Sequence, residues 1–199
     1  MIRDDLSDKL IHFTKGSDEE AADIFLKIIN ESRLLGGRGY IKGSHCCVCF
    51  TESPIGKLAH ILANRETYRF TYAPFGVMVD KLWLWDRGGR PVIYQSDQEY
   101  KLLHTDQKYR HKIYEPDNDI DFTWEREWRI KTPELDLDPD STTLIVPSRH
   151  WVDWLIGKHT AKVRWDVMAA EELEQGFGQY YVKSYPWHFI ALEDLGISL

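Results

Sequence analysis

The chain has 199 residues, of which 43% are hydrophobic and 29% charged, and its formal net charge is −7. This composition is ordinary for a globular protein with one sizeable core, so we expect a single domain spanning residues 1–199. An acidic chain lacks the basic footprint of broad nucleic-acid binding, although residues 108–112 form a short basic cluster that could serve as a local contact. No apolar run approaches the ~18 residues of a membrane-spanning helix.

Three cysteines, Cys46, Cys47 and Cys49, lie within four residues of a strand-like run. Neighbouring positions in a strand make poor disulfide partners, and an odd, clustered count is typical of reduced thiols. A zinc site formed with His45 would lack a second ligand pair at zinc spacing, so we expect no metal. The N-terminal residues are acidic and unlike a secretory signal, which favours a cytoplasmic protein.

The first two elements are predicted from local signals. Residues 9–14 (KLIHFT) have the pattern of a strand. Ser17 and Glu20 then have the spacing of a capping box, and apolar residues follow at helical intervals. A helix is therefore predicted to run to about Leu35, where the two glycines that follow would end it.

The middle of the chain mixes short strands, helices and turns. Helices are predicted after Ser53-Pro54 and at residues 98–109. Residues 81–86 fit a helical turn or an extended stretch equally well, and the acidic residues 115–121 are predicted as a loop. Strands are predicted at residues 45–51, 75–80 and 91–94.

Residues 124–130 (WEREWRI) contain two carboxylates, two guanidinium groups and two indoles. Their aromatic content predicts a strand, in which side chains alternate between faces. Glu125, Glu127 and Arg129 would share one face; the other would carry Trp124, Arg126, Trp128 and Ile130. A carboxylate beside an aromatic wall and a neighbouring charge is typical of positioned catalytic groups. A structural ladder of ion pairs covered by tryptophan is the alternative.

The C-terminal part, residues 141–199, is expected to complete the domain. The acidic residues 134–140 are predicted as a loop, and helices are predicted after Ser148 and near residues 167–174. Strands are predicted at residues 143–146, 161–165 and 188–191, with a further apolar run at 180–182. This order lacks the regular alternation of a doubly wound sheet and predicts the mixed α+β class.

Several familiar motifs are absent from the sequence, among them the phosphate-binding loops GxxxxGK[ST] and GxGxxG, the GxSxG elbow and HExxH. Cysteines of a buried strand are usually packing groups rather than nucleophiles. The remaining candidate chemistry lies in three motifs predicted on strands: His12-Phe13-Thr14, Cys49-Phe50-Thr51-Glu52 and Glu125-Arg126-Glu127.

In the order of these motifs, the sequence resembles a family of bacterial abortive-infection (phage-resistance) proteins whose biochemical function is unknown. The resemblance lies within residues 1–131 and rests on HFT, a helix, CFTE, YAPFGV, GGRPVIY and WEREWR in that order. More distantly, the layout is similar to the ADP-ribosyltransferase superfamily. That similarity implies split antiparallel β-sheets with flanking helices, and an NAD cleft between the sheets.

The resemblance also implies the roles of individual residues. The catalytic carboxylate would be Glu127, with Glu125 beside it, and it would bind the nicotinamide ribose and stabilise the positive charge of the transition state. The residues implied for binding NAD are His12 and Thr14 at the adenosine-side ribose, Thr51 on the middle strand, and Tyr72 or Tyr94 against nicotinamide. An acidic protein can bind anionic NAD if one or two arginines face the diphosphate, and Arg90 and Arg129 are the candidates.

Two hypotheses of different classes follow. The first is an enzyme that transfers ADP-ribose from NAD to a macromolecular acceptor, or hydrolyses NAD, in anti-phage defence. The second is a non-catalytic regulator or antitoxin-like partner of a defence system. The enzyme should gather His12, a tyrosine and Glu127 in one cleft. The interaction protein should instead expose a large aromatic patch and have no convergent polar pocket.

Overall fold

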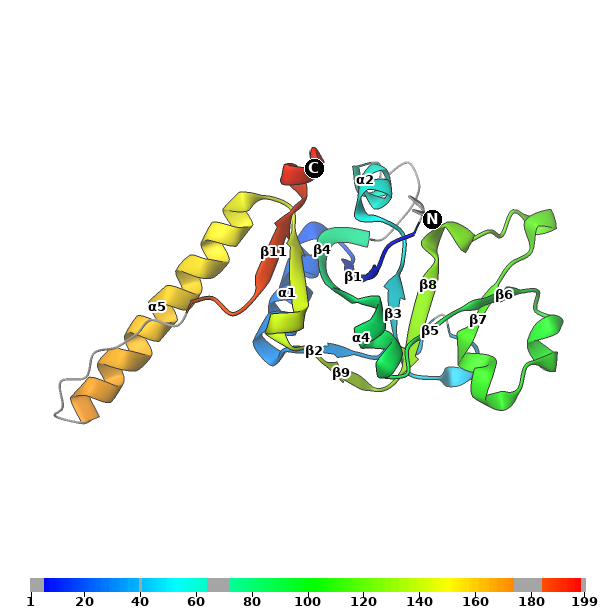
Figure 1. Cartoon of the computed structure of the whole chain (residues 1–199), viewed down its shortest axis with the longest axis horizontal. Coiled ribbons are helices and arrows are strands. Elements are labelled where there is room, and N and C mark those ends of the chain that lie inside the picture. The colour runs from blue at the N-terminus through cyan, green and yellow to red at the C-terminus, as the bar shows by residue number, and fades with distance from the viewer. Residues whose placement is uncertain (1–5, 40, 64–71, 174–183, 198–199) are drawn as a thin grey trace.

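Figure 1 shows the computed structural model of the chain, which describes residues 6–39, 41–63, 72–173 and 184–197. Its strands are β1 (Lys9–Lys15), β2 (Arg33–Leu35), β3 (Cys47–Thr51), β4 (Tyr72–Asp80), β5 (Arg90–Pro91), β6 (Ile93–Gln95), β7 (His111–Ile113), β8 (Glu127–Lys131), β9 (Glu134–Asp136), β10 (Thr142–Val146) and β11 (His188–Ala191). The α-helices in this part of the chain are α1 (Asp18–Glu31), α2 (Ile55–Ala63), α4 (Lys81–Asp86) and α5 (Arg149–Leu173). The class is mixed α+β.

A seven-stranded sheet in the order β11-β10-β4-β1-β3-β8-β5 forms the centre of the molecule. Neighbouring strands in it are antiparallel, except that β10 and β11 are parallel. The pairs β2-β9 and β6-β7 form two small sheets, antiparallel and parallel respectively. The sheet is therefore mixed rather than wholly antiparallel.

The large sheet is weakly joined between β1 and β3. In the described residues these two strands share one backbone pair, Ile11 with Thr51. By contrast, β1 pairs with β4 from Lys9 to Lys15, and β3 pairs with β8 over its whole length. The sheet thus has two well-paired parts, β11-β10-β4-β1 and β3-β8-β5, that meet at one residue pair.

Apolar side chains pack on both faces of the sheet. On one face, Phe25 of α1 lies against Phe75 of β4, with ring centroids 5.4 Å apart, and Trp151 of α5 contacts the same ring. On the other face, Leu58 of α2 packs in a cluster with Phe13 of β1. Because successive residues of β1 point to opposite faces, this one strand contributes to both clusters.

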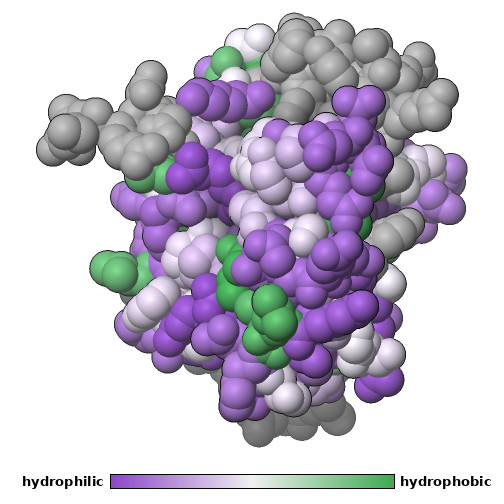
Figure 2. Space-filling view, turned by 90° about the vertical axis from the view of Figure 1, so that its right-hand side faces the viewer, coloured by the Kyte–Doolittle hydropathy of each residue, from purple (hydrophilic) through white to green (hydrophobic). Residues whose placement is uncertain are grey.

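Figure 1 places the small sheet β6-β7 at one end of the molecule and extends α5 beyond the opposite end. The β6-β7 sheet belongs to residues 92–126, which connect β5 to β8 and which we call the β6–β7 segment. Figure 2 views the molecule from that end, and hydrophilic residues cover most of the face, with a small apolar patch near its middle.

Local signals predicted several elements correctly. The capping box of α1 is present: the Ser17 hydroxyl accepts from the Glu20 N–H, and the Glu20 carboxylate accepts from the Ser17 N–H at 3.0 Å. The predicted short helix after Ser53-Pro54 is α2, and the undecided residues 81–86 form α4. The strands β1, β3, β4, β10 and β11 match predicted strands.

Helix α1 ends earlier than predicted. It stops at Glu31 because Ser32 adopts a left-handed conformation (φ 49°, ψ 40°), and β2 begins at the next residue. Strand β2 pairs with β9, which lies in the segment 134–140 predicted as a loop. Pairing with a distant segment, supported by the ion pair between Arg33 and Glu134, thus overrides the helical pattern.

The helix predicted at residues 98–109 is wrong. Two 3-10 helices occupy this region, η2 (Glu99–Leu102) and η3 (Thr105–Arg110), separated by Leu103 in an extended conformation. Leu102 is 85% exposed, so one of the apolar side chains that a helix here would bury lies in solvent instead. The strand predicted at residues 91–94 is also divided, because β5 and β6 belong to different sheets.

The strand predicted at residues 161–165 is wrong, because α5 is one helix from Arg149 to Leu173. Gly157 in its middle lowers helix propensity by about 1 kcal/mol but does not end a helix whose Leu155 is buried against the core. The apolar run predicted at residues 180–182 lies outside the described residues. In the part of the chain that is described, we find no helix with the length and apolar character needed to cross a bilayer.

Gly76 of β4 lies where β1 approaches closely. A Cβ atom at this position would lie 2.5 Å from the carbonyl oxygen of His12, which belongs to the backbone of β1. That oxygen cannot move without disturbing the pairing of β1 with β4. We therefore expect Gly76→Ala to lower the free energy of unfolding by about 1–3 kcal/mol, measured by urea denaturation.

The matched control is Gly157→Ala on the exposed surface of α5, where a Cβ atom would meet nothing within 4 Å. This change should raise the free energy of unfolding by up to about 1 kcal/mol, because alanine restricts the unfolded chain and favours the helix. Unchanged stability of Gly76→Ala would contradict the close approach of the two strands.

Candidate functional site

A cavity of about 630 Å³ lies beside the junction of the two parts of the large sheet. Residues of β1, β3 and β8 form its floor, and the β6–β7 segment forms one side. Another side is formed by Leu35, Gly37, Gly39, Ile41 and Lys42. Its wall is mainly apolar, with a few polar and charged groups directed into it. A cavity of this size and character is typical of small-molecule binding sites.

The cavity gathers five of the eight residues proposed for catalysis and NAD binding. They are His12, Thr51, Tyr72, Glu125 and Glu127. The other three, Thr14, Tyr94 and Arg90, are not among its lining residues. Each of these three has a structural contact instead, described below.

Glu125 reaches the cavity from a turn rather than from the predicted strand. Residues Thr123–Glu125 form the 3-10 helix η5, Arg126 is left-handed (φ 45°, ψ 50°), and β8 begins at Glu127. The strand prediction for the first three residues of WEREWRI is therefore wrong. Its central consequence holds nevertheless, because Glu125 and Glu127 both line the cavity.

The end of β3 holds this turn in place. The Thr51 hydroxyl donates to the Glu125 carbonyl, and the Ser53 hydroxyl donates to the Trp124 carbonyl, both at 2.5 Å. Because these hydrogen bonds bend the chain, Trp124 does not share a face with Trp128. Trp124 packs in the cluster beside α2, whereas Trp128 belongs to the cluster on the other face.

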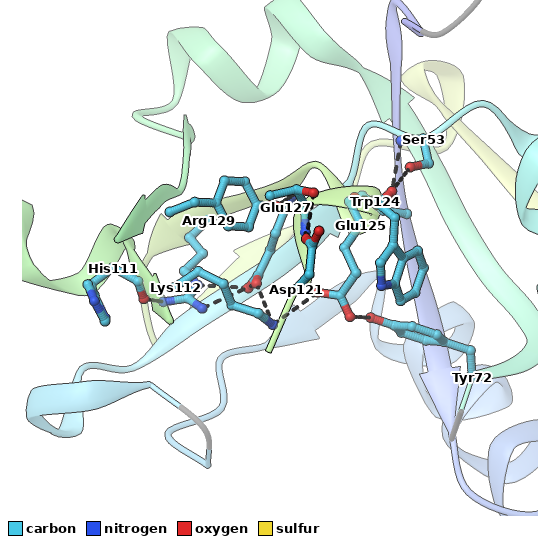
Figure 3. Close-up of polar contacts among 12 residues, drawn as sticks. Ser53, Tyr72, His111, Lys112, Asp121, Trp124, Glu125, Glu127 and Arg129 are labelled. Carbon is cyan, nitrogen blue, oxygen red and sulfur yellow. Dashed lines mark hydrogen bonds and ion pairs between the residues drawn. The ribbon is translucent and has the colours of Figure 1, made fainter. Parts of the chain in front are cut away.

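Two carboxylates and two cations meet in the cavity, and we call Glu125, Glu127, Lys112 and Arg129 the charge cluster (Figure 3). The Lys112 ammonium lies 3.0 Å from Glu125 and 3.1 Å from Glu127. The Arg129 guanidinium binds both oxygens of Glu127, through Nε at 2.7 Å and Nη2 at 3.2 Å. The formal charges of the cluster sum to zero.

Glu127 is ionised within this cluster. Burial opposes its charged form, but the hydrogen bonds and positive charges of Arg129 and Lys112 outweigh burial and hold its pKa below the ordinary value of 4.5. Burial likewise opposes the charged form of Lys112, and the two carboxylates reverse that effect and raise its pKa. Both ions are therefore charged at neutral pH.

Tyr72, and not Tyr94, faces the cavity. The Tyr72 hydroxyl donates to Glu125 at 3.3 Å, and the ammonium of Lys15 lies 5.0 Å from the centre of its ring. Burial and the nearby carboxylates raise the pKa of Tyr72, so its hydroxyl stays protonated. The Tyr94 hydroxyl instead accepts from the Glu127 N–H at 3.0 Å, and burial raises the pKa of Tyr94 to about 12.

His12 bridges the weak junction of the sheet. Its Nδ1 lies 2.8 Å from the carbonyl oxygen of Cys49 on β3. A carbonyl only accepts, so Nδ1 carries the proton, and burial lowers the pKa of His12 and favours the neutral ring. The next motif residue, Thr14, is buried and donates to the Phe75 carbonyl at 3.0 Å. Thr14 therefore ties β1 to β4.

Arg90 and Arg129 are poorly placed to bind a diphosphate. Arg90 lies over the ring of Trp85 and donates to the Trp85 carbonyl at 2.8 Å. Besides binding Glu127, Arg129 donates at 2.8 Å to the carbonyls of Tyr109 and His111. Two other cations line the cavity: Lys15, which is exposed, and Lys42, which pairs with Asp97; the sequence analysis singled out neither.

Lys112 is the principal residue that sequence analysis missed. It belongs to the basic cluster at residues 108–112, which suggested a surface contact for nucleic acid. In the structure Lys112 points into the cavity, where its ammonium also lies 4.5 Å from the ring centre of Phe122. The alternation of His111, Lys112 and Ile113 in a short strand could have shown that one of these side chains differs in direction from its neighbours.

Comparison of the chain with protein-family models, curated proteins and solved structures finds no match. Within the described ranges, no three histidine, cysteine, aspartate or glutamate side chains are grouped as a metal site requires. The three cysteines are free thiols, and burial followed by the charge of Glu127 raises the pKa of Cys49 to about 12.

The lowered pKa of Glu127 predicts how stability depends on pH. The ionised carboxylate stabilises the fold above the ordinary pKa of 4.5, and this contribution is lost as pH falls through the lower folded-state pKa. We expect Glu127→Gln to reduce the free energy of unfolding at pH 7 by about 2 kcal/mol, because the negative charge beside Arg129 and Lys112 is lost. The loss is limited because the amide still accepts a hydrogen bond from Arg129. The deficit should shrink toward pH 3 in urea denaturation.

The control is Glu134→Gln, which removes an exposed carboxylate paired with Arg33. Surface pairs contribute at most about 1 kcal/mol, so this variant should stay close to the wild type throughout. A deficit for Glu127→Gln that is the same at pH 7 and pH 3 would contradict an ionised Glu127 in the cluster.

Proposed function

We propose that the cavity binds NAD and that the protein is an ADP-ribosyltransferase-like enzyme, which modifies a macromolecular acceptor or hydrolyses NAD in bacterial anti-phage defence. The observation that carries this proposal is the convergence of His12, Tyr72 and Glu127 on one cavity. These residues come from β1, from the start of β4 and from β8, and the enzyme hypothesis requires them to meet.

The shape of the sheet supports the same proposal. The superfamily places its NAD cleft between two parts of a split sheet, and here the cavity adjoins Ile11 and Thr51, the pair that joins β1 to β3 in the described part of the chain. The side chain of His12 crosses this junction to the Cys49 carbonyl. A weakly paired junction exposes side chains and backbone groups of both strands to a ligand.

The residues present fit the parts of a dinucleotide. The ring of Tyr72 and the apolar wall suit nicotinamide, and the ammonium of Lys15 suits a phosphate. Thr51 lines the cavity, but its hydroxyl is used to hold the Glu125 carbonyl, so we assign it to positioning rather than to ligand contact. Arg90 and Thr14 are left out of the proposed binding site because their contacts lie elsewhere.

The two carboxylates suit the two demands of the chemistry. NAD supplies a glycosidic bond whose cleavage places positive charge on the ribose and releases neutral nicotinamide. Glu127, ionised and held rigidly by Arg129, would stabilise that charge. Glu125, hydrogen-bonded to Tyr72, would accept the proton of the attacking nucleophile. The apolar wall would limit the access of competing water.

One observation favours the second candidate, a non-catalytic regulator or antitoxin-like partner. Lys112 and Arg129 neutralise both carboxylates, which is also the arrangement of a purely structural ion-pair network. Against it, hydrophilic residues cover most of the face shown in Figure 2.

Calorimetry of NAD binding, with nicotinamide release followed in parallel, tests the enzyme proposal. We expect saturable binding by the wild type and a loss of release of about 100-fold or more in Glu127→Gln, because removing one preorganised electrostatic contact typically costs that much. Circular dichroism should show that the variant is folded under the assay conditions.

Glu134→Gln, outside the cavity, is the matched control and should bind NAD and release nicotinamide as the wild type does. Absence of NAD binding at millimolar concentration would overturn the enzyme proposal. The regulator would then be the function to pursue, by identifying a protein partner in pull-down experiments.

A further inference from the structure

The environment of Lys112 is that of a bound cation. Its ammonium is within hydrogen-bonding distance of two carboxylates and faces the ring of Phe122. Carboxylates and an aromatic face are the groups with which proteins recognise cationic ligands. The cavity therefore has the composition of a cation site, and a side chain of the protein itself occupies it.

The net charge of the cluster depends on whether Lys112 is in place. Glu125 and Glu127 contribute two negative charges, and Lys112 and Arg129 contribute two positive charges. Arg129 is fixed, because its nitrogens bind Glu127 and the carbonyls of Tyr109 and His111. Only withdrawal of Lys112 would leave the cluster with a net negative charge while the backbone contacts of Arg129 persist.

Lys112 is well placed to leave. The side chain of Lys112 is 19% exposed to solvent, whereas that of Arg129 is 2% exposed. It also ends a flexible four-carbon stem, so rotation of the side chain moves the ammonium toward solvent without displacing β7. Strand β7 itself stays anchored to β8, because Arg129 of β8 donates to the carbonyls of Tyr109 and His111.

We propose that Lys112 is an autoinhibitory residue whose ammonium occupies the position of the positively charged part of the substrate, and that substrate binding requires its displacement. This inference rests on the proposed function for the identity of the substrate. Nicotinamide in NAD is a pyridinium cation, and the ribose becomes positive as the glycosidic bond breaks. Both would compete with Lys112 for Glu125 and Glu127.

The test compares Lys112→Met, which keeps the length of the stem and removes the charge, with the wild type. The first probe is N-methylpyridinium, a small cation that lacks the rest of NAD, and its binding is measured by calorimetry. We expect Lys112→Met to bind it more tightly by about tenfold or more, because one competing unit charge is removed beside two carboxylates. Lys112→Arg should bind it as weakly as the wild type.

The matched control is Lys108→Met. Lys108 lies on η3 of the same segment, its ammonium faces the ring of Tyr100, and it does not line the cavity. This variant changes the net charge of the protein by the same amount and should leave binding of the probe unchanged. An equal gain in Lys108→Met and Lys112→Met would overturn the proposal, because it would show a general charge effect.

Equal binding of N-methylpyridinium by the wild type and a folded Lys112→Met would also overturn it. If Lys112→Met does not fold, Lys112→Gln takes its place, since the amide can donate to both carboxylates without a charge. NAD is the second probe. Tighter pyridinium binding in the variant without any NAD binding would support the role of Lys112 and reject NAD as substrate. Tighter binding of both would support both proposals.

Discussion

The arrangement of the site depends on the hydrogen bonds of the buried Arg129 guanidinium. It binds both oxygens of Glu127 on its own strand and two backbone carbonyls of the β6–β7 segment. One planar group therefore fixes the direction of a carboxylate and anchors the segment that forms one wall of the cavity. Because a buried guanidinium without partners is costly, loss of the carboxylate or of the carbonyls would destabilise both the site and the segment.

Much of the fold follows from local sequence signals. The capping box at Ser17 and the apolar strand patterns predict α1 and most of the large sheet, because their determinants lie within a few residues of each element. Two of the failures share one cause. The end of α1 and the start of β8 are set by partners far along the chain, such as β9 for β2 and the hydroxyls of Thr51 and Ser53 for the turn before Glu127.

The sequence predicted only part of the candidate site. The shared cleft of His12 and Glu127 was expected from the resemblance to ADP-ribosyltransferases, because strand patterns alone do not show which strands are neighbours. The choice of Tyr72 over Tyr94 depends on where the strand β6 leaves the sheet, which no local pattern encodes. The position of Lys112 in the cavity was not predicted, because a basic run suggests a solvated surface. Its side chain instead enters the cavity from a separate small sheet.

The position of β4 between β1 and β10 has a consequence for synthesis of the chain. Its two neighbours are made at very different times, since β1 precedes it and β10 follows more than sixty residues later. During translation of the intervening residues, the outer edge of β4 has no strand beside it, although Phe75, Val77 and Val79 are buried in the finished fold. An unpaired apolar edge invites association with other nascent chains, so the arrival of β10 closes a period of vulnerability to aggregation.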